Sequence, residues 1–139
     1  MQLLLVKCGA YNFGFNTSDL VTIINKCNTT KVPGASPFVQ SIVTYSNVQR
    51  GLVSREHLFN IATYDYNSYA VCNNLVIAIE EIVKVFDMPE SAVIPVGPFI
   101  DNKAFDGLCV SDGEIFFILN LSVIFDVITE SEKEYKDDK

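Results

Sequence analysis

The sequence predicts an all-β domain with a closed or nearly closed β architecture. About ten short apolar or aromatic runs follow one another along the chain, and turn-forming residues separate them. Helical periodicity is confined to two short stretches. Alternating strand and helix patterns, which would indicate a parallel sheet, are missing from the sequence.

The first half of the chain predicts an opening hairpin and two further strands. The strand-like runs, rich in β-branched and aromatic residues, are Leu3–Cys8, Tyr11–Phe15, Leu20–Ile24 and Phe38–Tyr45. Gly9-Ala10 separates the first two runs, which is typical of a hairpin. Segment 28–37 holds two prolines and a glycine, which favours an irregular connection.

The second half predicts another set of strands and a second hairpin. Its strand-like runs are Ala70–Cys72, Leu75–Phe86, Phe105–Val110 and Ile115–Leu119. Asp112-Gly113 lies between the last two runs and is the strongest local hairpin signal in the chain. Ser54–Phe59 looks like one helical turn, with Ser54 as its N-cap.

A C-terminal helix is predicted after Asn120, which can cap it. Its apolar residues recur at helical spacing: Leu121, Ile124, Phe125 and Ile128. The last ten residues carry eight charges of both signs and too little apolar surface to order themselves. We therefore expect one domain over residues 1–129 and an unstructured tail over 130–139.

Length and composition fit one soluble domain of 139 residues. No stretch approaches the roughly 20 apolar residues that cross a bilayer, and Lys7 interrupts the first apolar run too early for a signal peptide. Four cysteines are scattered among apolar neighbours without a CxxC pair, which suits buried thiols in a reducing compartment. We expect a cytoplasmic protein.

Charge is distributed unevenly along the chain, although the net charge is −7. Residues 1–57 carry five Lys/Arg and two acids, whereas residues 58–139 carry five and fifteen. This polarity suits a protein with one acidic and one more basic face, and equally an ordinary solvated surface. It argues against a nucleic-acid backbone as the main ligand.

The sequence offers no recognisable catalytic or cofactor site. Its only histidine, His57, lies in a polar turn. Glu80 and Glu81 are neighbours in a strand-like run, so they point to opposite faces and cannot share a proton or a metal. One histidine and dispersed cysteines do not supply a tetrahedral metal site. We expect a protein that is not an enzyme and holds no cofactor or metal.

Several collinear segments resemble the CheW-like family. Tyr11-x-Phe13-Gly14-Phe15 resembles its opening hairpin, and Leu20–Ile24 resembles its V-x-E-I-x strand. The most specific stretch is Val32–Val43, which is similar to VPxAPxFVxGVI. Further matching segments are Ile79–Val85, Ala92–Val96, Phe105–Leu108 and Ile118–Phe125.

The resemblance implies two small five-stranded SH3/OB-like β-barrel lobes that share a core, with a division near residues 66–70. It also implies a non-enzymatic adaptor that couples a CheA-type histidine kinase to chemoreceptors. Two alternatives stay open: a diverged regulator that binds the kinase without receptor coupling, and a small β-barrel that binds a ligand.

This chain departs from the family where partners are thought to bind. The family Glu of V-x-E-I is Thr22, and the Arg-Gly of N-L-R-G is Ser46-Asn47. In the family this Glu and Arg are thought to pair across neighbouring strands, and the chain lacks both. By resemblance, the candidate partner-binding residues are Thr22, Ser41, Ile42, Ser46, Asn47 and Gly51.

Overall fold

The computed structural model describes residues 1–9, 11–26, 29–31, 39–54, 68–95 and 104–137. Its strands are β1 Gln2–Cys8, β2 Tyr11–Asn16, β3 Leu20–Ile24, β4 Thr29–Lys31, β5 Val39–Tyr45, β6 Val48–Val53, β7 Ser68–Cys72, β8 Leu75–Ile79, β9 Glu81–Asp87, β10 Phe105–Ser111 and β11 Glu114–Leu119. Its helical elements are the 3-10 turns η1 Thr17–Asp19 and η2 Glu90–Ala92, and the helix α2 Leu121–Asp137.

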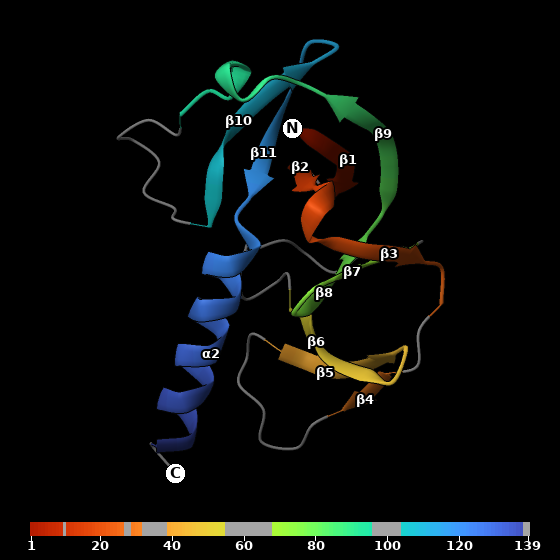
Figure 1. Ribbon diagram of the computed structural model, residues 1–139. Coiled ribbons are helices and arrows are strands. Elements are labelled where there is room, and N and C mark those ends of the chain that lie inside the picture. Colours follow the sequence, from red (N-terminus) through yellow and green to blue (C-terminus); the bar gives the residue numbers. More distant parts are fainter. Residues whose placement is uncertain (10, 27–28, 32–38, 55–67, 96–103, 138–139) are drawn as a thin grey trace.

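The strands form two sheets, which we call lobe 1 and lobe 2. Lobe 1 has five strands in the order β10-β11-β2-β1-β9, and lobe 2 has six in the order β3-β7-β8-β6-β5-β4. Figure 1 shows lobe 1 above lobe 2, with α2 running down from the end of β11. The predicted two-lobed all-β fold is confirmed. Lobe 2 has six strands rather than the expected five, because it includes the three-residue strand β4. The described sheets are curved but are not closed barrels.

Lobe 1 comes close to closure, because its two edge strands are joined by contacts outside the main ladder. Ile94, which follows β9, exchanges two backbone hydrogen bonds with Leu108 of β10, at 2.7 and 2.8 Å. The Lys84 ammonium of β9 lies 3.1 Å from the Asp112 carboxylate at the tip of the β10–β11 hairpin. These contacts enclose a small core around Leu3, Leu5 and Phe116.

Two tight turns join neighbouring strands in lobe 1. Cys8 faces Tyr11 across Gly9, which has φ 64°. Ser111 faces Glu114 across Asp112 and Gly113, with φ values of 51° and 79°. Positive φ at both central residues is typical of a hairpin turn that matches the twist of its strands. Both predicted hairpins are confirmed.

A larger core is shared by the two lobes, as the resemblance implied. It contains Val6 and Phe13 from lobe 1, Ile77 from lobe 2 and Ile124 from α2. The chain enters lobe 2 at η1 and returns at Glu80, the single residue between β8 and β9. The division expected near residues 66–70 is therefore wrong, because β7 starts at Ser68 and lies within lobe 2.

The C-terminal helix begins as predicted but is longer. The Asn120 Oδ1 atom accepts a hydrogen bond from the Val123 N–H at 3.0 Å, which caps the first turn. Leu121, Ile124 and Ile128 are buried in the shared core. The expected unstructured tail over 130–139 is wrong as far as Asp137, because the helix continues to that residue. Glu and Lys are good helix formers, so a docked helix can continue through a charged segment.

The helical turn predicted at Ser54–Phe59 lies outside the described residues, apart from Ser54 itself, which is buried.

Replacing Gly107 with alanine should weaken the closure of lobe 1. A Cβ atom there would lie 2.6 Å from Val93 Cγ1 and 2.7 Å from the Ile94 carbonyl oxygen, so the Ile94–Leu108 bridge must shift. We expect Gly107→Ala to lower the free energy of unfolding by about 2 kcal/mol in urea titrations. Gly14→Ala is the control, because its Cβ would meet Leu5 Cδ2 at an ordinary 3.4 Å. An equal loss in both variants would contradict the closure argument.

The Asn120 cap should contribute measurably to stability. We expect Asn120→Ala to reduce the free energy of unfolding by about 1 kcal/mol, since the Val123 N–H loses its acceptor. Asn120→Ser keeps a capping oxygen but loses the hydrogen bond from Nδ2 to Asp106 Oδ1, at 2.8 Å. It should therefore lose less than Asn120→Ala. Equal losses would show that the cap is not the source of the effect.

Candidate partner-binding surface

Five of the six residues assigned by resemblance lie on the β5–β6 hairpin. Ser41 and Ile42 belong to β5, Gly51 belongs to β6, and Ser46 and Asn47 form the turn. Both turn residues are exposed and have positive φ, 51° and 63°. This turn was not predicted from the sequence, although Asn readily adopts the left-handed conformation. The hairpin thus gathers these five positions on one element at the end of lobe 2 (Figure 1).

The two faces of the hairpin differ. Ile42 is half-buried and pairs with Thr30 of β4 and with Gly51 of β6, so these three residues form a row across neighbouring strands. Gly51 allows close packing, because a Cβ atom there would lie 3.2 Å from Val39 Cγ1. Ser41 is only 6% exposed, so its side chain belongs to the interior. The row of Thr30, Ile42 and Gly51 is the more accessible candidate surface.

Thr22, the sixth residue, lies apart from the hairpin in the ladder. It is half-buried on β3, where it pairs with Val71 of β7. Three strands, β7, β8 and β6, separate β3 from β5 in the hydrogen-bonded order. The ladder of the described strands therefore does not place Thr22 opposite Ser46, and the cross-strand arrangement expected for these two positions is not found in it.

Arg50 stabilises the β5–β6 hairpin, a role that was not predicted from the sequence. Its NH1 group donates to the Tyr45 carbonyl oxygen and its Nε to the Asn73 carbonyl oxygen, each at 3.3 Å. The first contact spans the hairpin, and the second reaches the β7–β8 turn. Because β6 and β8 pair through only two residues each, at Gly51–Leu75 and Leu52–Val76, this side chain reinforces a short parallel junction.

Exposed apolar side chains also lie on the edge strands of both lobes. Val21 on β3 is 45% exposed, and Ile82 and Val85 on β9 are 43% and 56% exposed. An edge strand offers unpaired backbone groups as well as side chains, so it can accept a partner protein. These residues belong to the sheet edges through which an adaptor could bind.

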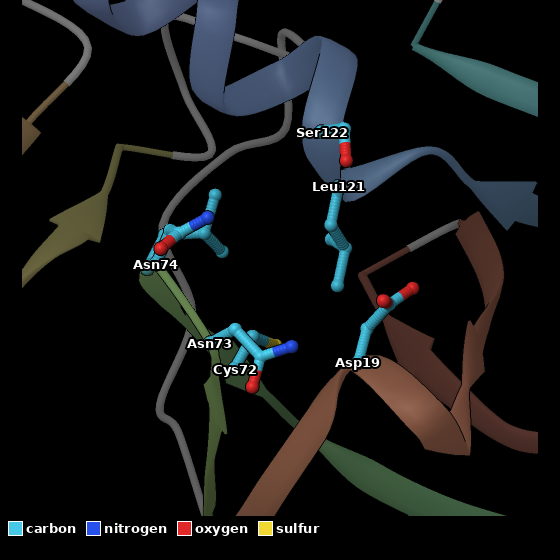
Figure 2. Close-up of a pocket in the computed structure, with 7 residues that line it drawn as sticks. Asp19, Cys72, Asn73, Asn74, Leu121 and Ser122 are labelled. Atoms are coloured by element: carbon cyan, nitrogen blue, oxygen red, sulfur yellow. The ribbon is translucent and has the colours of Figure 1, made fainter.

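A small hollow of about 50 Å³ lies where the lobes meet α2 (Figure 2). It is lined by Asp19, Cys72, Asn73, Asn74, Leu75, Leu121 and Ser122. The pKa of the Cys72 thiol is raised from 9.0 to about 12, mainly because the thiol is buried; the Asp19 charge contributes to the rise, and the Arg50 charge opposes it. At neutral pH this thiol is protonated and is a poor nucleophile.

Among the described residues there is no group of three or more side chains suited to hold a metal ion. No helix in the same part of the chain is long and apolar enough to span a membrane.

Comparison with known proteins assigns the fold to a family. The model of the CheW-like domain matches residues 2–129. The chain belongs to the CheW-like domain family. Among the solved structures that match this CheW-like domain is the crystal structure of the scaffolding protein TtCheW from Thermoanaerobacter tengcongensis, with a TM-score of 0.76 and 14% identity. The match covers 86% of this chain and 88% of TtCheW. Among curated proteins, none matches the sequence.

The raised pKa of Cys72 predicts a loss of stability in alkali. Above pH 9.0 the thiol ionises in the unfolded chain but stays protonated in the folded domain up to about pH 12. Below pH 9 this group should not change stability, and between these limits it should lower the free energy of unfolding by up to about 1.4 kcal/mol per pH unit. Urea titrations of wild type and Cys72→Ala at pH 8, 9 and 10 isolate the effect. Parallel pH profiles of the two proteins would refute it.

Substitution of Arg50 should lower the free energy of unfolding more than the loss of an exposed ion pair does. We expect Arg50→Met, which keeps the length but removes both donors, to lower the free energy of unfolding by about 1–2 kcal/mol. Lys84→Met removes the exposed pair with Asp112 and should cost less than about 1 kcal/mol. Denaturant titrations measure both values. The assignment fails if Lys84→Met is as damaging as Arg50→Met.

Proposed function

We propose that this protein is a non-enzymatic adaptor of the cytoplasm that couples a CheA-type histidine kinase to chemoreceptors. Membership of the CheW-like family supports this proposal, as does the fold shared with a protein described as a scaffold. The observation that carries it is the clustering of five candidate positions on one hairpin of lobe 2. A scaffold works by holding surfaces in fixed positions, so separate surfaces on one rigid core suit this role.

Two surfaces take the two partners in this proposal. The hairpin row of Thr30, Ile42 and Gly51 is uncharged and at least partly exposed, which suits a protein interface. The β9 edge offers Ile82 and Val85 as apolar anchors on lobe 1. Because Glu80 alone joins β8 to β9, the two lobes cannot move freely against each other. Binding at one surface therefore fixes the position of the other.

A regulator that binds the kinase without coupling it to a receptor is the second candidate. It is favoured by the neutral side chains at Thr22 and Ser46, where the family carries a charged pair. Removing both partners of a pair avoids a stranded charge, so the fold tolerates the change while a contact that needs either charge is lost. In that case the protein binds the kinase alone.

Binding assays with the kinase and receptor of the same organism test the proposal. We expect wild type to bind the purified kinase and a receptor cytoplasmic fragment, and to increase their co-sedimentation when all three are mixed. Ile42→Lys should weaken one of these interactions at least tenfold, because a charge at an apolar interface must be desolvated. Val85→Lys tests the β9 edge in the same way.

Val127→Lys is the matched control, since Val127 is also an exposed apolar residue, at 39%, but lies on α2. It should leave both affinities within twofold of wild type. Kinase binding without receptor binding would identify the regulator, and binding to neither would refute both candidates. Thermal unfolding of each variant shows that the fold is intact.

A further inference from the structure

The hollow between the two lobes and α2 is lined by polar side chains that the proposed function does not use. They come from three separate elements: Asp19 from η1, Asn73 and Asn74 from the β7–β8 turn, and Ser122 from the first turn of α2. Figure 2 shows Asp19, Asn73 and Leu121 around a common space. We call this space the Asp19 hollow.

The Asp19 carboxylate has no hydrogen bond and no ion pair within the part of the chain that the structure describes, although the side chain is half-buried. The ion pairs of the described residues lie elsewhere, in lobe 1. The Asp19 main-chain oxygen, by contrast, accepts a hydrogen bond from the Asn73 N–H at 3.1 Å, which holds η1 against the β7–β8 turn. The charge is thus held in position but is not paired.

Two positive groups near the hollow do not cancel this charge. The Arg50 guanidinium donates to the main-chain oxygens of Tyr45 and Asn73 rather than to the Asp19 carboxylate. At the Cys72 thiol, which lines the hollow, the Asp19 charge shifts the pKa more than the Arg50 charge does. The first turn of α2 carries the positive end of a helix dipole, equivalent to about half an elementary charge. A full carboxylate charge exceeds it, so the hollow attracts a cation.

The size and the lining of the hollow suit a guanidinium group. Its volume is about 50 Å³, and a water molecule needs about 10–15 Å³ of such space, so about three or four atoms of that size fit. A guanidinium is a flat group with five N–H donors. Oxygen atoms of Asp19, Asn74 and Ser122 can accept from these donors, while Leu75 and Leu121 can pack against an aliphatic stem. A lysine ammonium is compact and strongly hydrated, and it matches several acceptors less well.

We propose that the Asp19 hollow binds an arginine side chain of a partner protein. The guanidinium lies against the Asp19 carboxylate, and its methylene groups lie against Leu75 and Leu121. Because the lining comes from η1, the β7–β8 turn and α2, one arginine contacts both lobes and the helix. The inference goes beyond the proposed function, since it uses neither the β5–β6 hairpin nor the β9 edge, and rests on it only for the identity of the partner.

Titration of the full-length, 15N-labelled protein with N-acetylarginine methylamide tests the inference by NMR. We expect saturable shifts of the backbone amide signals of Asp19, Asn73, Asn74 and Ser122. Asp19→Asn keeps the size of the side chain but removes its charge, so it should raise the Kd at least fivefold. Asp126→Asn is the matched control, because Asp126 is an exposed carboxylate of α2 outside the hollow; its Kd should stay within twofold of wild type.

Two further ligands separate charge from shape. The citrulline analogue, in which a neutral urea group replaces the guanidinium, should bind at least tenfold more weakly, and the lysine analogue at least threefold more weakly. Absence of saturable shifts in wild type overturns the proposal. Equal binding of either analogue, or equal affinities of wild type and Asp19→Asn, also overturns it, because the carboxylate then selects no guanidinium.

Ser122→Asp keeps the proposal testable if Asp19→Asn fails to fold. An acidic side chain in the first turn of a helix interacts favourably with the helix dipole, so this variant should fold. The added carboxylate should lower the Kd of the arginine analogue at least threefold. An unchanged or higher Kd would contradict the assignment.

Binding to the kinase and to the receptor fragment identifies the source of the arginine. We expect Asp19→Asn to weaken binding to one of these proteins at least fivefold, and Asp126→Asn to weaken neither. If wild type binds the arginine analogue but Asp19→Asn leaves both protein affinities unchanged, the hollow takes a free guanidinium compound, and the docking proposal is overturned. If wild type binds neither protein, the proposed function fails while the analogue titration still decides whether the site exists, so the two failures differ.

Discussion

The return of the chain from lobe 2 to lobe 1 through one residue is the constraint on which the rest of the structure depends. β8 ends at Ile79 and β9 begins at Glu81, and the Glu80 N–H donates to the Lys7 carbonyl oxygen at 3.0 Å. This contact brings β8 against β1, where the Cys8 thiol donates to the Ala78 carbonyl oxygen. One side of β1, with Val6 and Cys8, then packs with Ile77 and Ile79 of β8 in the core that the two lobes share.

The sequence predicted the elements whose signals are local. Gly9, Asp112 and Gly113 adopt positive φ in turns that follow from their residue types, and Asn120 caps its helix through its own side chain. The β5–β6 turn was missed because Ser46-Asn47 carries no glycine, although Asn47 was a usable signal. The continuation of α2 to Asp137 was missed because a charged composition was taken as disorder, while helix propensity favoured the helix.

The candidate site was harder to predict because it depends on strand order. Residue types indicate that Leu20–Ile24 and Val39–Tyr45 are strands, but not that β7, β8 and β6 lie between them. Ser41 is buried where β5 lies between β4 and β6. The turn signals in the sequence do not indicate this strand pairing, so they could not predict that Ser41 is buried. The resemblance supplied the positions, and only the ladder shows which of them share a face.

The contacts of Arg50 hold the β5–β6 hairpin without a charge at Thr22 or Ser46, the positions that the resemblance assigns to a charged pair. A carboxylate–guanidinium pair holds strands together only if both partners are present, and a lone buried partner is costly. Arg50 instead donates to two main-chain carbonyl oxygens. These acceptors are present whatever side chains Tyr45 and Asn73 carry. The hairpin is therefore held in place by contacts that do not involve Thr22 or Ser46.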